Sequence, residues 1–229
     1  ETGSVQRHPP EGGPRLWALG LHSSVVAPPV VDSDGIVYVG TIDPGPVNAI
    51  SPDGQLLWSV ETGPVEVSPA IGSLYVATAW GQLLSFDERN GAILWEQAIE
   101  TPAFPAVISH NGDVYTLGEG NLSRISPDGE YQWHSGNLTS VRYKSVAVDQ
   151  DGNAYLLDRA GDLWAVDWDG SLQMLATTGA EWLAHGPDGI IYLGTEKGIA
   201  ALQAARTNVT GPPVDVQPVY LEWLTSRNI

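Results

Sequence analysis

The 229-residue sequence contains no cysteine. Disulfide bonds, thiolate zinc sites and a cysteine nucleophile are therefore excluded. It also lacks any run of 18 apolar residues, the length that a membrane-spanning helix requires. Basic residues are few, 10 against 27 acidic ones, which gives a formal net charge of −17. A surface this acidic repels phosphate backbones, so we expect no nucleic-acid partner, no membrane insertion by this segment, and a preference for basic partners.

Residues that form turns are abundant. Charged residues make up only 16% of the chain, whereas there are 26 glycines, 17 prolines and 9 tryptophans. This balance is unlike that of a helical bundle and predicts many short strands joined by tight turns.

Internal repetition is the strongest signal. A Gly-x-x-Tyr motif recurs five times at intervals of about 40 residues, and Asp-Gly or Asn-Gly turns precede most copies. Such turns supply the positive φ angles that tight hairpins need. The five copies are Gly35/Tyr38, Gly72/Tyr75, Gly112/Tyr115, Gly152/Tyr155 and Gly189/Tyr192.

A second set of turns lies between the first. Each ends in glycine and is followed, four residues later, by Trp58, Trp95, Trp133 or Met174. One period therefore contains four strands within about 40 residues, which is the size of a propeller blade. We predict an all-β fold, a five-bladed β-propeller of four-stranded antiparallel blades. Residues 15–20, which carry Trp17, are expected to close it as the fourth strand of the last blade, because closure removes open sheet edges. The alternative is a segment of a longer propeller, in which residues 219–223 form another fourth strand.

The stretch Val67–Trp95 resembles the blade of PQQ-type (quinoprotein-like) repeat proteins, and so does Pro28-Pro-Val-Val with Gly35–Gly40. The resemblance covers about residues 15–204. It implies that the recurrent Trp17, Trp58, Trp95 and Trp133 pack between neighbouring blades and are structural.

Quinone catalysis does not follow from this resemblance. Quinoproteins use eight blades, a vicinal cysteine pair and a calcium site, whereas this chain has five repeats, no cysteine and no array of carboxylates on its first strands. A five-bladed glycosidase needs two converging acids, and only Glu66 and Glu181 lie at the starts of first strands. The Asp-x-Asp-Gly turns lack the further ligands of a calcium loop. We therefore expect a non-enzymatic member of the family with no cofactor, no catalytic residues and no metal.

Positions that differ between repeats are the best indication of a binding site. At the starts of the first strands, repeats three to five carry aromatic and charged residues, which suit protein or sugar recognition. The loops between second and third strands are expected to share this face. The predicted partner-binding residues are Phe104, Arg142, Tyr143, Lys144, Glu181, Trp182, Trp80 and Arg159, with Glu119, Glu196 and Lys197 nearby.

Three Asn-x-Ser/Thr sequons, at Asn121, Asn137 and Asn208, and the initial Glu1-Thr2-Gly3 point to an extracytoplasmic protein. We expect residues 1–14 to be an expression scar and flexible segment, 15–204 the propeller, and 205–229 a C-terminal tail or linker. The predicted function is a propeller module of a secreted, periplasmic or cell-surface protein (an ectodomain) that binds a protein partner. The alternatives are a carbohydrate-binding lectin and, less favoured, a five-bladed glycosidase.

Overall fold

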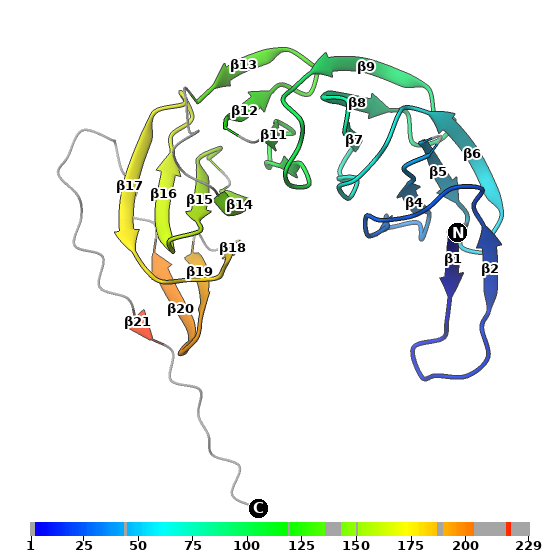
Figure 1. Ribbon diagram of the computed structural model, residues 1–229, viewed down its shortest axis with the longest axis horizontal. Coiled ribbons are helices and arrows are strands. Elements are labelled where there is room, and N and C mark those ends of the chain that lie inside the picture. Colours follow the sequence, from blue (N-terminus) through cyan, green and yellow to red (C-terminus); the bar gives the residue numbers. More distant parts are fainter. Residues whose placement is uncertain are drawn as a thin grey trace, which may run out of the picture. The chain divides into compact units, whose positions relative to one another are not determined.

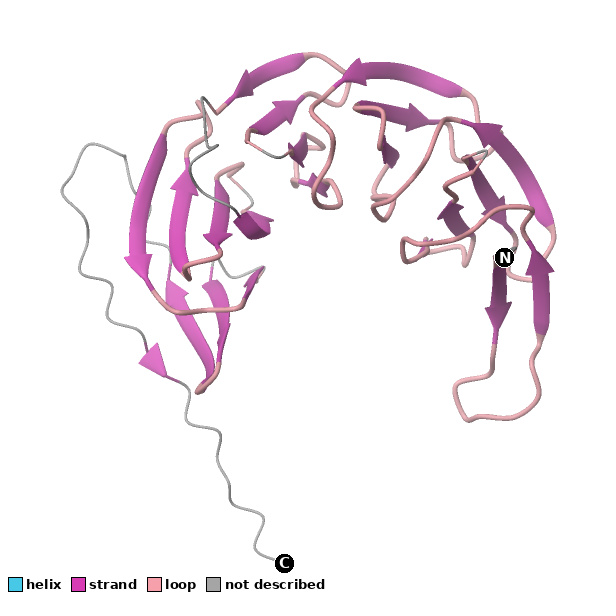
Figure 2. Ribbon diagram, viewed as in Figure 1, coloured by secondary structure: helices cyan, strands magenta, loops and turns pink. Residues whose placement is uncertain are grey.

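The computed structural model describes residues 3–43, 45–118, 120–135, 143–149, 151–186, 190–203 and 219–220. The secondary structure of these residues is all β, in line with the composition (Figures 1 and 2). Among them there is no helix that is long and apolar enough to cross a membrane.

The strands form antiparallel sheets in which sequence neighbours pair (Figure 1). The first is a hairpin of β1 (Ser4–Arg7) and β2 (Trp17–Gly20), and the second contains β3 (Val30–Val31), β4 (Val37–Gly40), β5 (Pro46–Ile50) and β6 (Leu56–Glu61). The third contains β7 (Leu74–Thr78), β8 (Gln82–Phe86) and β9 (Ile93–Ala98), and the fourth β10 (Val107–Ile108), β11 (Val114–Leu117), β12 (Leu122–Ile125) and β13 (Tyr131–His134). The fifth contains β14 (Tyr143–Val148), β15 (Ala154–Asp158), β16 (Asp162–Val166) and β17 (Leu172–Thr177), and the sixth β18 (Trp182–His185), β19 (Ile190–Thr195), β20 (Gly198–Gln203) and β21 (Val219–Tyr220).

The chain divides into two compact units, which are described separately. Unit 1 comprises Glu1–Ile108, Val114–Glu119 and Ser123–Gln132, and unit 2 comprises Ser109–Asp113, Gly120–Leu122 and Trp133–Ile229.

The aspartates of the predicted hairpin turns hold the turns together. Asp32 Oδ1 accepts hydrogen bonds from the backbone N–H groups of Asp34 and Ile36, both at 2.9 Å, and the Tyr38 hydroxyl donates to Asp32 Oδ2 at 3.0 Å. Asp149 is bonded in the same way, and accepts from Tyr155 at 3.1 Å. Each Gly-x-x-Tyr motif of this kind therefore ties the second strand to the turn that precedes it.

The hydrophobic core lies between the faces of successive sheets. In unit 1, Tyr38, Val47 and Trp58 of one sheet pack with Leu74 and Phe86 of the next. In unit 2, residues of β15 and β16 pack in the same way against residues of β19 and β20. The inner strands are consequently buried on both faces, as face-to-face packing of sheets requires.

The recurrent tryptophans join one repeat to the next. The indole N–H groups of Trp17, Trp58, Trp95 and Trp133 each donate, at 2.5–2.9 Å, to a backbone carbonyl in the turn before the following outer strand. The acceptors are Pro52, Glu88, Pro127 and Trp168. Each indole ring also lies against the glycine of that turn. If the glycine carried a Cβ atom, this atom would lie 2.6 to 3.2 Å from the nearest ring atom. The distances are 2.6 Å for Gly54 and Trp17, 2.7 Å for Gly91 and Trp58, 2.7 Å for Gly129 and Trp95, and 3.2 Å for Gly170 and Trp133. Glycine is required there both for its positive φ and for the absence of a side chain.

The N-terminal strand differs from the prediction. It was expected to complete the last sheet, but β2 pairs with β1, and β20 pairs with β21 instead. The reason is proximity, since Ser4–Arg7 lies across one short loop from β2 and closing a short loop costs little entropy. Ser4–Arg7 thus forms a strand, and Val219–Tyr220 is the fourth strand of the last sheet, the place that the alternative of a longer propeller gives it. The described residues form six sheets, so neither the blade count nor ring closure is confirmed.

Candidate functional site

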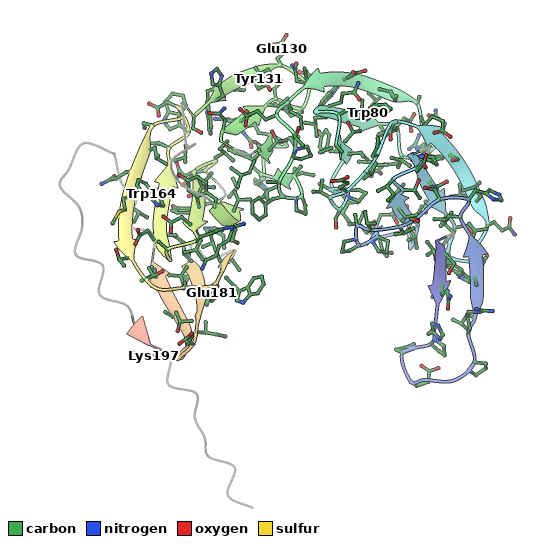
Figure 3. The ribbon with its side chains drawn as sticks, in the orientation of Figure 1. Trp80, Glu130, Tyr131, Trp164, Glu181 and Lys197 are labelled. Atoms are coloured by element: carbon green, nitrogen blue, oxygen red, sulfur yellow. The ribbon has the colours of Figure 1, made fainter. Side chains whose placement is uncertain are left out.

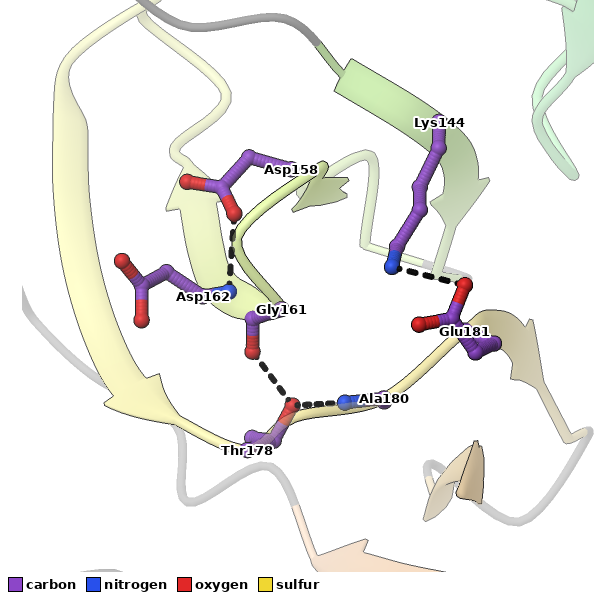
Figure 4. Close-up of polar contacts among 7 residues, drawn as sticks. All are labelled: Lys144, Asp158, Gly161, Asp162, Thr178, Ala180 and Glu181. Carbon is purple, nitrogen blue, oxygen red and sulfur yellow. Dashed lines mark hydrogen bonds and ion pairs between the residues drawn. The ribbon is translucent and has the colours of Figure 1, made fainter. Parts of the chain in front are cut away.

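Three of the predicted partner-binding residues come together in unit 2. Lys144 Nζ lies 3.1 Å from Glu181 Oε2, an ion pair that joins the start of β14 to the residue before β18 (Figure 4). The lysine side chain is only 18% exposed, while the glutamate is 60% exposed. Trp182, the next residue, is 73% exposed. An exposed indole beside a half-buried ion pair is a surface typical of protein recognition.

The segment that leads to Glu181 is held by a hydrogen-bonded loop. The Thr178 hydroxyl donates to the Gly161 carbonyl at 2.7 Å and accepts from the Ala180 N–H at 3.2 Å (Figure 4). Gly161 has a φ of +87°, and a Cβ there would come within 2.6 Å of Gly179. These contacts fix the connection between β17 and β18, and with it the position of Glu181.

The buried side chain of Asp158 stabilises the hairpin of β15 and β16 through hydrogen bonds. One oxygen accepts from the Asp162 N–H at 2.8 Å (Figure 4). The other oxygen accepts from the Trp164 indole N–H at 3.0 Å. Arg159, which follows Asp158, is exposed at the tip of this hairpin. The turn is therefore a rigid support with a charged side chain free to reach a partner.

Tyr143 is a correction to the sequence interpretation, because it is buried (8% exposed) and not part of an exposed aromatic surface. The pairing of β14 with β15 has a bulge between Tyr143 and Ser145, so Lys144 is the extra residue of this bulge and is more accessible than its neighbour Tyr143. Its hydroxyl has no hydrogen-bond partner among the described residues. Burial, and secondarily the charge of Asp158, raises the pKa of Tyr143 to about 12.

Two other predicted residues, Phe104 and Trp80, belong to unit 1. Phe104 is half-buried, in the bend before β10. Trp80 is 67% exposed and lies on Gly63, where a Cβ would come within 2.5 Å of the ring (Figure 3). In unit 1, Trp80 is thus an exposed aromatic side chain that packs against Gly63, and it is distinct from the group of predicted residues in unit 2.

The remaining predicted site residues that the structure describes are not part of the group formed by Lys144, Glu181 and Trp182. Glu196 and Lys197 are exposed on the hairpin between β19 and β20 (Figure 3). Of the three sequons, Asn121 is half-buried just before β12. Arg142, Glu119, Asn137 and Asn208 lie outside the described residues. Within the part of the chain that the structure describes, no group of three or more His, Cys, Asp or Glu side chains is arranged to hold a metal ion.

Sequence reasoning missed the residues that support the site, namely Thr178, Gly161 and Asp158. A signal was present, because a Thr-Gly dipeptide occurs at both Thr62-Gly63 and Thr178-Gly179. The Thr62 hydroxyl donates to the Gly45 carbonyl at 2.9 Å, the counterpart of the Thr178 bond. The dipeptide is a loop-fixing element of the repeat.

The four-stranded antiparallel sheets, their face-to-face cores and the tryptophan joints define a repeat protein of the β-propeller class. A family model described as outer membrane protein assembly factor BamB matches residues 43–182, more than half of the chain. The chain belongs to this family of PQQ-type repeat proteins, and the family predicted from the sequence is confirmed.

Individual relatives agree. The outer membrane protein assembly factor BamB of Nitrosomonas eutropha is 30% identical over 115 residues, covering 47% of this chain and 28% of that protein. BamB of Yersinia pestis is 25% identical over 255 residues, covering 92% of this chain and 64% of that protein. The chain therefore spans less than two thirds of the length of these curated relatives.

Solved structures support the fold. The crystal structure of BamB from Moraxella catarrhalis matches with a TM-score of 0.61 at 17% identity, covering 88% of this chain and 64% of that one. Virginiamycin B lyase from Staphylococcus aureus matches with a TM-score of 0.62 at 12% identity, covering 99% and 77%. At such identities the likeness concerns the fold alone, and an enzyme and an assembly factor share it.

Proposed function

We propose that this chain is a non-enzymatic binding module that holds a protein partner outside the cytoplasm, in the manner of an assembly factor. Family membership supports the class of function, because the relatives are outer membrane protein assembly factors. It also agrees with the extracytoplasmic location predicted from the sequence, since the outer membrane lies outside the cytoplasm. The number of blades remains a prediction from the repeat spacing.

The observation that carries the proposal is the surface formed by Lys144, Glu181 and Trp182, with Arg159 on the adjacent hairpin. Trp182 pairs with Gly194 across β18 and β19, where a Cβ would lie 3.3 Å from the indole, so the ring leans over a glycine and keeps its other face exposed. Burying such a ring at the centre of an interface is often worth ~2 kcal/mol or more.

The partner that this surface fits is a folded or extended polypeptide with an apolar anchor point and acidic and basic groups around it. The ion pair offers both signs of charge, and the glutamate side is the more exposed. The net charge of −17 adds a preference for basic partners, which would associate faster at low ionic strength because salt screens charges beyond about 10 Å at 0.1 M.

The test compares two exposed tryptophans of unit 2. Trp182→Ala and Trp168→Ala both remove a largely exposed indole, since Trp168 is 63% exposed, but Trp168 lies on the turn between β16 and β17. The purified chain is used as bait in an envelope extract, and captured proteins are identified and then titrated as purified components. We expect Trp182→Ala to weaken binding at least ~10-fold while Trp168→Ala does not. Equal binding by wild type and Trp182→Ala would overturn the assignment of this surface.

A further inference from the structure

The outer strands of two sheets in unit 1 carry pairs of aliphatic residues that the fold leaves exposed. Leu56 and Leu57 begin β6, and Ile93 and Leu94 begin or follow directly in β9. These four side chains, which we call the aliphatic patch, are 44–62% exposed. Both strands are internal to unit 1, between the β1–β2 hairpin and β10, and Figure 1 shows them following one another along the outer side of that unit.

A β-bulge exposes the leucine of each pair. The register of β6 against β5 shifts between Leu56 and Trp58, so Leu57 is the extra residue of a bulge. In β9, Leu94 is the extra residue of a bulge at the same place, directly before the tryptophan. A bulge interrupts the hydrogen-bonding ladder and increases the twist of the strand, and it protects an edge against the addition of a further strand. A partner therefore meets the side chains of the patch and not the backbone groups of these strands.

A tryptophan joint connects the two pairs. Trp58, which follows Leu57, donates to the Glu88 carbonyl at 2.9 Å, and its ring lies against Gly91, two residues before Ile93. Trp58 is itself only 9% exposed. The joint thereby fixes the start of β9 beside β6, and the two aliphatic pairs lie on neighbouring stretches of the surface of unit 1.

The fold does not require aliphatic residues at these positions. In the next outer strand, β13, the corresponding residues are Tyr131 and Gln132. Gln132 is exposed, and the tryptophan that follows it, Trp133, still forms its joint with the Trp168 carbonyl. Tyr131 is used by the fold itself, because its hydroxyl donates to the Ala98 carbonyl at 2.7 Å. An exposed leucine is thus not needed to form a joint, and burial against a partner accounts for the aliphatic pairs.

Acidic residues surround the patch. Segments 51–61 and 87–98, which hold the two outer strands and the turns before them, contain five acidic residues and one basic residue. The acidic ones are Asp53, Glu61, Asp87, Glu88 and Glu96. Burial, and then the charges of Asp32, Asp87 and Asp34, raise the pKa of Glu88, whose carbonyl is the acceptor of the joint. A basic partner is therefore favoured beside the patch, whereas an anionic lipid surface or a second copy of this chain, with its net charge of −17, is repelled.

We propose that the aliphatic patch is a docking site for a basic amphipathic helix of a partner protein. The aliphatic stripe of the helix covers Leu57 and Leu94, and its lysine or arginine side chains reach the acidic residues around them. A helix fits because it presents aliphatic side chains in a row without backbone pairing, which the two bulges oppose. The inference rests on the proposed binding function and adds to it a second surface, in unit 1, separate from Trp182 in unit 2.

The probe is a fluorescein-labelled peptide of leucine and lysine that forms an amphipathic helix (LKKLLKLLKKLLKL), titrated with the intact chain and followed by fluorescence anisotropy. One control peptide has glutamate in place of lysine, and the other has serine in place of leucine. We expect the leucine–lysine peptide to bind at least ~10-fold more tightly than either control. Equal binding of the serine peptide would show that charge alone is recognised, and equal binding of the glutamate peptide would show that the partner is not basic. Either result would overturn the proposal.

A double variant locates the site. Leu57→Gln with Leu94→Gln removes the exposed leucines and introduces the residue that the next repeat has at this position, so we expect an unchanged melting temperature and peptide binding at least ~10-fold weaker. The matched control is Val26→Gln with Ile199→Gln, which removes side chains that are 55% and 46% exposed elsewhere at the same net charge. The control should bind the peptide as the wild type does. Equal binding by the two double variants would overturn the assignment of the patch.

A second variant keeps the leucines and removes charge. Glu61→Gln with Glu96→Gln should weaken the peptide about 3-fold at low ionic strength, and the difference should vanish at high salt, which screens such charges. Trp182→Ala should bind the peptide as the wild type does, even if the Trp182 surface captures no envelope protein, so the two proposals can fail separately. Loss of peptide binding in Trp182→Ala would place the helix in unit 2 and overturn this one.

Sedimentation distinguishes a partner from self-association. We expect the wild type and Leu57→Gln with Leu94→Gln to sediment alike. If the wild type is a dimer and the double variant a monomer, a second copy of this chain covers the patch, and docking of a basic helix is refuted.

Discussion

The two units use the same repeat for different purposes. In unit 1, Trp17, Trp58 and Trp95 each close a joint onto the next turn. In unit 2, Trp133 closes one such joint onto Trp168. The corresponding position of β17, however, is Met174, which is 41% exposed, and the bulge that lies just before the tryptophan in unit 1 lies after Met174. Tryptophans that recur at the repeat period therefore build the scaffold, whereas Trp182, which does not recur, is left to the solvent.

The largest expected difference is between the two kinds of tryptophan. Trp58→Ala should lower the free energy of unfolding by ~3–5 kcal/mol, because Trp58 is 9% exposed, stacks on Phe86 at 5.9 Å and donates to Glu88. Trp182→Ala should change it by less than ~0.5 kcal/mol. Urea denaturation followed by circular dichroism measures both. Similar losses for the two variants would refute the division into scaffold and surface tryptophans.

The loop that supports Glu181 should be the next most sensitive feature. Gly161→Ala forces a Cβ to within 2.6 Å of Gly179 at a φ of +87°, so we expect a loss of ~1–3 kcal/mol. Gly198→Ala is the control in the same unit, because Gly198 also has positive φ (+129°) but nothing within 4 Å of an added Cβ. Thermal unfolding compares the two. A smaller loss for Gly161→Ala than for Gly198→Ala would show that the contact with Gly179 does not constrain the loop.

The sequence predicted the repeated part of the fold well. Turns such as Asp32–Gly35, and the tryptophans that follow the second set of turns, obey local rules that a single sequence displays. It could not predict that β2 pairs with β1, because Ser4–Arg7 has no repeat signature. It also could not show that Tyr143 is buried while its neighbour Lys144 pairs with Glu181, because a bulge between Tyr143 and Ser145 interrupts the alternation of β14 there.

Tyr143 and Tyr38 offer a finer comparison. The Tyr38 hydroxyl donates to Asp32 at 3.0 Å, whereas the Tyr143 hydroxyl has no partner among the described residues. Tyr38→Phe should therefore cost about 1–2 kcal/mol, while Tyr143→Phe should be neutral or stabilise the fold by up to ~1 kcal/mol. Urea denaturation at pH 7 measures both changes. A loss of stability in Tyr143→Phe would indicate that its hydroxyl is hydrogen-bonded in solution.

The same tyrosine predicts an alkaline effect. Because the pKa of Tyr143 is raised to about 12, the folded state holds its proton at pH values where the unfolded chain releases it. Stability should fall as pH rises from 10 to 12, and Tyr143→Phe should reduce the slope by up to ~1.4 kcal/mol per pH unit. Unfolding free energies of the two proteins between pH 9 and 11.5 test this. Parallel curves would contradict the burial of the phenol.

The smallest expected effect concerns Glu88 and the aspartates around it in unit 1. Burial, and then the charges of Asp32, Asp87 and Asp34, raise the pKa of Glu88. A raised carboxyl pKa means that the fold favours the protonated form, so stability is lost as pH rises through that pKa. Glu88→Gln keeps the shape and removes the charge. It should raise the melting temperature near neutral pH by roughly 1 °C, a small value because the group is partly exposed and screened by solvent.

The gain from Glu88→Gln should disappear below pH 4, where the native glutamate is itself protonated. Glu130→Gln is the control, because Glu130 directly follows the turn before β13 and is exposed; we expect no change in melting temperature for it. Differential scanning calorimetry at pH 7 and pH 3.5 separates the two variants. A gain in Glu88→Gln that persisted at pH 3.5 would mean that shape or hydrogen bonding, and not charge, is responsible, and the electrostatic account of this edge of unit 1 would be wrong.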